Sequence, residues 1–405
     1  MTEQGPTCQI HKKYYWINCQ NPALPVDPEG LCILHSQDKS KDPVAFREVL
    51  RDRWKQEDAE FYDFRGVFFP GPFYPQEFFG SIEFVKPADF SMATFMKVAF
   101  FPEATFRGPA NFSNAFFTES AVFSKATFTN WASFLGAIFT EASFNSATFT
   151  EWVNFYSANL KLADFRWATF SGEAIFVAIH PPQEKRWERG PFEGRFEGLR
   201  LGPKALIRFE DLSLAMVRFG GTDLRYARFF KVIWHRLRGR NAVYDETFLK
   251  KEKNYDQVEE LYRHLKLNYE REGDLKKAGD FHYGEMEMYR QADYLRRWFS
   301  WYFLYWASSG YGEKPLRAFC VLFGLLAILT VLFGWADSKL IKGWSLDGII
   351  DSILYTLQQG TFQRPEWYKP ANSWGKFLAT ITLILIPGQA ALFLLALRNR
   401  LGRRR

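Results

Sequence analysis

Residues 126–149 read ATFTNWASFLGAIFTEASFNSATF, and one pattern recurs through the whole stretch. A small residue stands two positions before a large apolar one, which here is always Phe, and spacers of two or three residues separate the units. A recurrence of five to six residues matches neither the period of a helix nor that of a strand. The pattern therefore predicts a solenoid in which each unit forms one short face, with Ala and Phe inside and the spacer at the corner.

Units of this kind run from residue 83 to residue 176 and explain why the chain holds 43 Phe in 405 residues. They resemble pentapeptide repeats, in a variant that alternates five- and six-residue spacing. The resemblance implies a right-handed quadrilateral β-helix of about four coils over this stretch. Its interior would hold Phe90, Phe95, Phe106, Phe112, Phe117, Phe123, Phe128, Phe134, Phe139, Phe144, Phe149, Phe155, Leu160, Phe165, Phe170 and Phe176, with a looser unit at Val98–Phe100.

The borders of the β-helix follow from where the repeat weakens. We expect a linker at 46–82, the β-helix at 83–235 and a loop insertion at 177–205, because HPPQEKRWERGP at 180–191 holds three prolines. The repeat resumes in degraded form at 207–229, as a last coil or cap. Some relatives of this fold mimic DNA, which requires a strongly acidic surface. Eight acidic and six basic residues between Glu83 and Phe176 do not supply one.

The first 45 residues hold three of the four cysteines and predict a small zinc-binding module. Cys8, Cys19, Cys32 and His35 are a complete tetrahedral ligand set for structural zinc, and metal binding would supply folding energy to a segment with little apolar core. The alternative is that these residues are free cytosolic thiols and solvated histidines. The first thirty residues contain no apolar core of a secretory signal, so we expect this module in the cytosol, where a disulfide framework is disfavoured.

Residues 245–292 predict a helical hairpin that turns at Gly273. The hairpin resembles one tetratricopeptide unit, and AGDFHYGEMEMYR resembles the helical segment that follows the repeats in a bacterial subgroup of pentapeptide-repeat proteins. It also holds His282, Glu285 and Glu287, the only cluster that looks suited to metal binding or proton transfer. A surface hydrogen bond explains such a pair better, and no nucleophile or phosphate loop stands out, so we expect no enzyme.

The C-terminal part predicts a membrane domain at 315–405. Apolar stretches at 316–335 and 376–397 are each long enough to cross a bilayer, and 293–314 is an aromatic segment suited to the headgroup interface. Basic residues precede the first stretch and follow the second, which predicts cytoplasmic N- and C-termini and a multi-pass protein of the bacterial inner membrane. The net charge of +7 is then directed to lipid headgroups rather than to nucleic acid.

Two features of this domain bear on conduction. Gly310-Tyr311-Gly312 spells part of a potassium filter but precedes the first apolar stretch, so the match is an accident. Residues 345–366 form an amphipathic helix that ends at Gly360, between the two stretches, and resemble the re-entrant pore loop of two-transmembrane potassium channels. The resemblance implies a pore lined by Thr356, Gln358, Gln359, Gly360 and Thr361.

Pro387 and Gly388 lie in the middle of the second stretch and predict a gating hinge, or else a kink in a plain anchor helix. We therefore expect a mixed fold that couples a cytoplasmic β-helix to an oligomeric, ion-channel-like pore, tetrameric if it conducts. The alternative is a membrane-anchored scaffold without conduction. In that alternative a flat side of the β-helix offers a surface to a protein partner.

Overall fold

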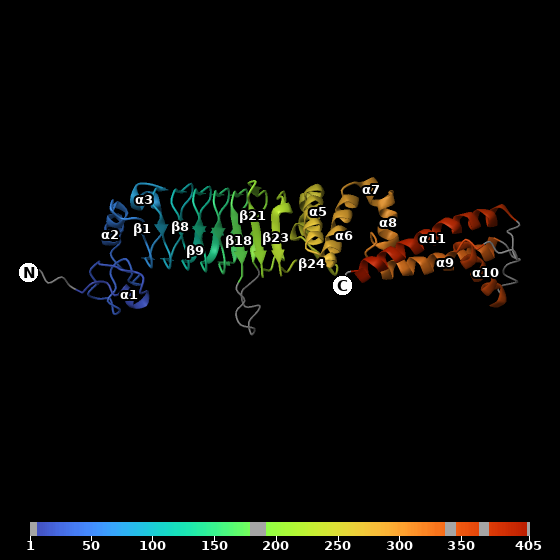
Figure 1. The fold of residues 1–405 in the computed structure, drawn as a ribbon, viewed down its shortest axis with the longest axis horizontal. Coiled ribbons are helices and arrows are strands. Elements are labelled where there is room, and N and C mark those ends of the chain that lie inside the picture. Colours follow the sequence, from blue (N-terminus) through green and yellow to red (C-terminus); the bar gives the residue numbers. More distant parts are fainter. Residues whose placement is uncertain (1–5, 179–191, 337–345, 364–371, 403–405) are drawn as a thin grey trace, which may run out of the picture. The chain divides into compact units, whose positions relative to one another are not determined.

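The computed structural model describes residues 6–178, 192–336, 346–363 and 372–402. The chain divides into two compact units, Met1–His264 and Leu265–Arg405. Short parallel strands dominate the first unit, and the second contains helices (Figure 1). The proline-containing stretch at 180–191, within the predicted insertion, lies outside the described residues.

Three parallel sheets form a solenoid of about seven turns (Figure 1). One sheet contains, in spatial order, β1 (Tyr62–Asp63), β4 (Ala88–Asp89), β8 (Ala110–Asn111), β11 (Ala132–Ser133), β14 (Val153–Asn154), β18 (Glu173–Val177), β21 (Leu206–Glu210) and β23 (Ala227–Phe230). The second contains β3 (Glu83–Phe84), β7 (Thr105–Phe106), β10 (Thr127–Phe128), β13 (Thr148–Phe149), β17 (Thr169–Phe170) and β20 (Arg200–Leu201).

The third sheet contains longer strands that span two faces of a coil, so three sheets enclose a four-sided core. Its members are β2 (Phe68–Phe69), β5 (Thr94–Phe95), β6 (Ala99–Phe100), β9 (Phe116–Val122), β12 (Ile138–Ser143), β15 (Asn159–Leu160), β16 (Leu162–Asp164), β19 (Glu193–Arg195) and β22 (Met216–Arg218). The register repeats once per coil, since Ala88 pairs with Ala110, Ala110 with Ala132, and Ala132 with Val153.

Phenylalanine rings stack in columns inside the solenoid. In the column that contains Phe112, the ring centroids lie 4.9 Å from Phe90 and 5.2 Å from Phe134, with interplanar angles of 1° and 7°. Each buried Phe contributes about 1.5–3 kcal/mol by the hydrophobic effect. All sixteen predicted interior residues are buried, so the predicted ladder is confirmed.

The two-residue spacers form tight turns at the corners. The Ala93 N–H donates to the Phe90 carbonyl at 3.1 Å, and Met92 between them has φ +57°. This is a type II turn, whose third residue requires positive φ. Asn114 and Gly136 occupy the same place in the next coils, so the turn recurs once per coil.

The solenoid begins earlier than the repeat pattern indicates. The segment predicted as a linker contains α2 (Pro43–Lys55) and α3 (Pro75–Phe79), and β1 pairs with β4 in parallel. Trp54 of α2 stacks on Tyr62 at 4.1 Å and on Phe79 at 4.3 Å. These rings cover the N-terminal end of the phenylalanine core, and the linker expected at 46–82 is corrected to a cap and a first coil.

Two smaller expectations change as well. Phe101 is fully buried whereas Phe100 is exposed, so the looser unit is Ala99-Phe100-Phe101 rather than Val98–Phe100. Residues 193–201, expected within the insertion, form β19 and β20 and pair with β16 and β17. The degraded repeat at 207–229 forms the last coil, as expected, because β21 pairs with β23.

The first unit ends with the hairpin of β24 (His235–Leu237) and β25 (Arg240–Ala242), then η2 (Tyr244–Phe248) and α4 (Leu249–Glu252). A short η1 (Leu224–Tyr226) precedes β23, and α1 (Ile10–Lys13) lies near the N-terminus. The buried Asp245 carboxylate accepts backbone N–H groups of Phe219 at 3.0 Å and Gly220 at 2.9 Å. It thereby satisfies donors at the exposed end of the last coil.

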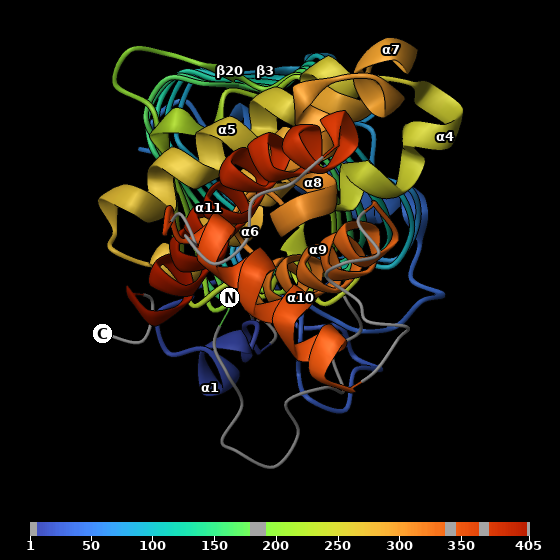
Figure 2. The same ribbon diagram turned by 90° about the vertical axis from the view of Figure 1, so that its right-hand side faces the viewer.

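The remaining helices are α5 (Tyr255–Arg271), α6 (Leu275–Gln291), α7 (Tyr294–Trp298), α8 (Trp301–Ser309), α9 (Pro315–Ala336), α10 (Leu346–Gly360) and α11 (Ser373–Gly402). The expected hairpin is formed by α5 and α6, which Gly273 at φ +77° separates. Within the second unit, α10 lies against both α9 and α11 (Figure 2).

Candidate functional site

Three cysteines and one histidine meet in the N-terminal module, as the sequence predicts. The ligand atoms of Cys8, Cys19, Cys32 and His35 all lie within 4.8 Å of one another, and all four residues are buried. The Cys19 and Cys32 sulfurs are 3.8 Å apart, and His35 Nδ1 lies 3.3 Å from Cys32 Sγ and 3.4 Å from Cys8 Sγ. Tetrahedral zinc with bonds of about 2.3 Å to sulfur and about 2.0 Å to nitrogen requires separations of this size.

Neighbouring groups orient these four side chains. The distal nitrogen of His35 lies 3.1 Å from the Arg65 carbonyl, which fixes Nδ1 towards the thiols. Arg53 donates to Cys19 Sγ at 3.0 Å, and the Cys32 N–H donates to Cys8 Sγ at 3.2 Å. Such outer contacts are typical of structural metal sites.

Hydrogen bonds within the cluster shift the pKa values of Cys19, Cys32 and His35. A hydrogen bond from Cys19 lowers the pKa of Cys32, and the same bond raises the pKa of Cys19. Burial lowers the pKa of His35, but its hydrogen bonds to Cys32 and Cys8 outweigh burial and raise it to about 9. These opposite shifts arise because the thiols and the imidazole lie within hydrogen-bond distance of one another.

The second unit contains two helices long and apolar enough to cross a membrane, Pro315–Trp335 of α9 and Ser373–Leu401 of α11. Only 17% of the most apolar window of each is buried within the chain. Large apolar side chains such as Trp335 and Ile384 are 81% and 69% exposed. A soluble core helix would bury such residues, and exposed apolar surface of this extent is typical of helices that contact lipid or other proteins.

The helix α10 has two different faces. Ser352, Tyr355, Thr356 and Gln359 are buried within the unit, whereas Ile349, Ile350, Ile353, Leu354 and Leu357 are exposed. With 15 residues, α10 is about 22 Å long, which is too short to cross a bilayer. An amphipathic helix of this length between two span-length helices is an arrangement that fits a re-entrant segment.

The predicted pore residues lie at the C-terminal end of α10 in different surroundings. Thr361 is exposed and Gln358 is half-buried, while Gln359 and Gly360 are buried. The Thr356 hydroxyl donates to the Ser352 carbonyl at 2.8 Å and lies 3.4 Å from the Thr330 hydroxyl of α9. Within one chain, Thr356 is therefore engaged by its own helix and by α9.

The predicted hinge lies beside the predicted pore. A Cβ atom on Gly360 would come within 2.6 Å of Ile386 Cγ2, so α10 and α11 touch at the residue before Pro387. The helix α11 continues through Pro387 and Gly388, and Gly388 faces open space. Gln389 follows, and its amide donates to the carbonyls of Ser308 at 3.0 Å and Ala318 at 2.9 Å.

The sequence analysis did not anticipate the role of Gly310-Tyr311-Gly312. The three residues have φ of +58°, +59° and +72°, and they form the turn between α8 and α9. Tyr311 is buried, its hydroxyl donates to Glu287 at 3.0 Å, and Arg290 donates to the same hydroxyl at 3.0 Å. The turn thereby ties the buried Glu287–Arg290 pair of α6 to the start of α9.

Trp306 completes this junction. The guanidinium groups of Arg290 in α6 and Arg317 in α9 lie 4.6 and 4.8 Å from its ring centroid. A repeated aromatic–basic pattern around 290–317 is the only sequence signal for the junction. The pairing with Glu287 could not be inferred, because it joins residues 24 positions apart.

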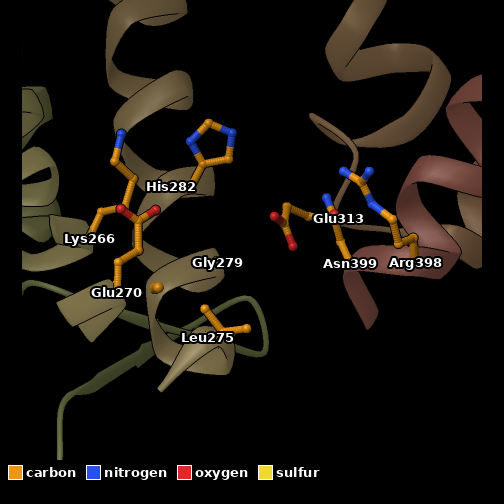
Figure 3. A pocket seen from close by; sticks show the side chains of 9 residues that line it. Lys266, Glu270, Leu275, Gly279, His282, Glu313, Arg398 and Asn399 are labelled. Atoms are coloured by element: carbon orange, nitrogen blue, oxygen red, sulfur yellow. The ribbon is translucent and has the colours of Figure 1, made fainter. Parts of the chain in front are cut away.

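The cluster of His282, Glu285 and Glu287 divides between two surroundings. Lys266 donates to Glu285 at 2.7 Å and His282 lies 3.7 Å from the same carboxylate, whereas Glu287 belongs to the Tyr311 junction. Figure 3 shows Lys266 and His282 on one side of a cavity of about 490 Å³, with Glu313 and Arg398 on the other. Among the described residues, the side chains that line this cavity include basic and acidic groups. They do not include a nucleophile aligned with a general base.

Comparison with known proteins agrees with the solenoid. A family model described as pentapeptide repeats (9 copies) matches residues 101–148. This stretch contains β7 to β12 and half of the sixteen predicted interior residues. No curated protein and no solved structure matched the chain. The chain thus combines a pentapeptide-repeat solenoid with two helices of membrane-spanning length.

Proposed function

We propose that this chain is a membrane protein in which a cytoplasmic pentapeptide-repeat solenoid is coupled to an oligomeric, ion-channel-like pore. In this proposal α9 and α11 cross the inner membrane of a bacterial cell, both termini are cytoplasmic, and α10 enters the bilayer from the outer side. The observation that carries it is α10, which is too short to span and ends against Ile386, directly before the hinge.

The exposed apolar face of α10 supports an oligomer. One chain contributes one short helix and one polar end, and a pore needs several such ends around an axis. Four copies would bring four sets of Gln358, Gln359, Gly360 and Thr361 together, and the exposed Ile and Leu side chains of α10 would pack against neighbours or lipid. This segment lacks the potassium-filter sequence, so no particular permeant ion is proposed.

The junction at Tyr311 supports coupling to the pore. It links α6 to the start of α9, and Asn399 near the end of α11 donates to the Gly312 carbonyl at 3.1 Å. A movement of α6 would therefore displace the start of α9 and the C-terminal end of α11. The solenoid would present a flat side to a protein partner or another signal that moves this element.

Ion flux from proteoliposomes tests the proposal. We expect flux above that of empty vesicles, and a charged methanethiosulfonate reagent should block it in Thr361→Cys, made in a Cys320→Ser background. The matched control is Leu346→Cys, exposed at the other end of α10, which should be labelled without block. Absence of flux for cations and anions alike would leave the alternative, an anchored scaffold. Labelling of Thr361→Cys from the compartment of the N-terminus would contradict the topology.

We also propose that the Cys3His cluster binds structural zinc. Three thiolates and one imidazole nitrogen would hold the metal through Cys8, Cys19, Cys32 and His35, and the metal would stabilise a module with few apolar residues. We expect about one zinc per purified chain by mass spectrometry of the metal. Cys32→Ser should lose it and Cys320→Ser, in α9, should keep it, whereas equal zinc content in both variants would contradict the site.

A further inference from the structure

A second cavity of the Leu265–Arg405 unit has a positive lining. It has a volume of about 770 Å³, and its charged lining residues are Lys276, Asp280, Glu313, Lys314, Arg317 and Arg400. Four basic and two acidic side chains give a net charge of +2. The residues come from α6, from the turn before α9 and from the ends of α9 and α11. Such a lining favours a ligand that carries phosphate.

Arg317 is held in place to receive such a ligand. Its Nη1 donates to the Trp306 carbonyl at 2.9 Å, and its guanidinium lies over the Trp306 ring. This leaves further N–H donors of a fixed, planar group for an anion. The ammonium group of Lys314 lies 4.8 Å from the Tyr283 ring centroid, which restricts it in a similar way.

An apolar stripe on α9 continues directly from this cavity. Leu316 and Cys320 line the cavity, and Leu316, Cys320 and Phe323 follow one another on the same helix face at spacings of four and three residues. Leu316 is 71% exposed and Phe323 is 56% exposed. A free phosphate ion would make no contact with this apolar stripe, whereas the acyl chain of a lipid would cover it.

We propose that this cavity binds the headgroup of an anionic phospholipid, with its phosphate among the basic side chains and an acyl chain along Leu316, Cys320 and Phe323. The inference rests on the proposed membrane crossing of α9 and α11 but not on ion conduction. The positive net charge selects an anionic headgroup over a zwitterionic one. A lipid bound here would contact α6, α9 and α11 at the Tyr311 junction.

Native mass spectrometry of the full chain, released from detergent with added lipid, tests the proposal. The probes are dioleoyl phosphatidylglycerol, dioleoyl phosphatidylcholine and inorganic phosphate. We expect phosphatidylglycerol to bind at least tenfold more tightly than phosphatidylcholine, and inorganic phosphate not to displace it. Phosphatidylcholine binding of equal affinity, or displacement by phosphate at millimolar concentration, would overturn a lipid site.

The variant Lys276→Gln/Arg400→Gln removes two charges from the cavity. Each basic residue near a membrane surface contributes about 1 kcal/mol to binding of anionic lipid, or about fivefold, so affinity should fall about 25-fold. Lys161→Gln/Lys376→Gln removes the same charge from an exposed solenoid position and from the opposite end of α11, and should bind like the parent chain. Arg400→Lys keeps the charge and should retain most of the affinity.

The outcomes separate this site from the proposed channel. Tight phosphatidylglycerol binding without ion flux would support the lipid site and count against the pore. A chain that stays in solution without detergent and binds none of the lipids would overturn both. Equal lipid affinity of the cavity variant and its control would overturn the site alone, whatever the flux.

Discussion

Replacing Gly360 with alanine tests the contact between α10 and the hinge directly. The backbone of Gly360 is not in the left-handed region, so alanine causes no backbone strain there. Its Cβ would lie 2.6 Å from Ile386 Cγ2 and 3.0 Å from Ile386 Cβ. Carbon atoms pack at about 3.5–4.0 Å, so the two helices must separate by about 1 Å or Ile386 must leave its rotamer.

Overpacking of this kind costs about 1–3 kcal/mol. The matched control is Gly324→Ala, also in an apolar helix but with nothing within 4 Å of an added Cβ. Exposed helix positions gain up to about 1 kcal/mol when glycine becomes alanine. We therefore expect opposite signs: Gly360→Ala lowers the melting temperature in detergent and Gly324→Ala leaves it unchanged or raises it.

A double-mutant cycle assigns the effect to Ile386. Ile386→Ala removes Cγ2, the atom nearest to the new Cβ, and keeps only the Cβ at 3.0 Å. The pair Gly360→Ala/Ile386→Ala should therefore be more stable than the sum of the single changes predicts, by about 1–3 kcal/mol. If α10 and the hinge act as one gate, Gly360→Ala should also change ion flux and Gly324→Ala should not. A coupling energy near zero, or equal shifts for the two glycines, would refute the contact.

Three other changes probe the core, the last coil and the junction. Phe123→Ala should lower the free energy of unfolding by about 3–5 kcal/mol in urea followed by circular dichroism, and Phe116→Ala, whose ring is exposed, by about 1 kcal/mol. Burial raises the pKa of Asp245 from 3.8 to about 6, so the folded state holds this proton more tightly. The resulting stability, about 3 kcal/mol, is complete below pH 4 and lost as pH rises through 6; Asp245→Asn should abolish that slope in melting curves. Tyr311→Phe should remove the hydroxyl that hydrogen-bonds to the Glu287–Arg290 pair. The turn before α9 should then lose about 1–3 kcal/mol of local stability and show faster hydrogen exchange.

The sequence predicts the solenoid well because its information is local. Each A-x-F unit specifies an inward Phe, and each two-residue spacer specifies a turn such as that at Met92, so reading along the chain is enough. The pattern predicts the wrong structure only where the chain departs from the A-x-F unit. At Phe100-Phe101 two rings stand together and only burial distinguishes them, and before residue 83 the first coil is closed by Trp54 from a helix that no repeat announces.

The clustering of Cys8, Cys19, Cys32 and His35 was also predictable, since cysteine and histidine in a short segment have few alternative arrangements. The groups that orient them were not. Arg53 lies in α2 and Arg65 lies two residues after β1, and only the fold of the first coil brings them to the cluster. Such outer contacts depend on tertiary packing and have no sequence spacing of their own.

The role of Gly310-Tyr311-Gly312 in the second unit could not be predicted from neighbouring residues in the sequence. Its place before α9 excludes a filter, and the three residues are instead used for backbone conformations that few side chains adopt. The buried tyrosine then completes an ion pair that α6 supplies. Glu287 and Arg290 both belong to α6, so the hydrogen bonds to the Tyr311 hydroxyl are what join α6 to the turn before α9. Moving α6 away would leave that buried hydroxyl without partners, at a cost of about 1–3 kcal/mol. A junction held in this way resists separation of α6 from the turn before α9, which is a property that the proposed coupling between solenoid and pore requires.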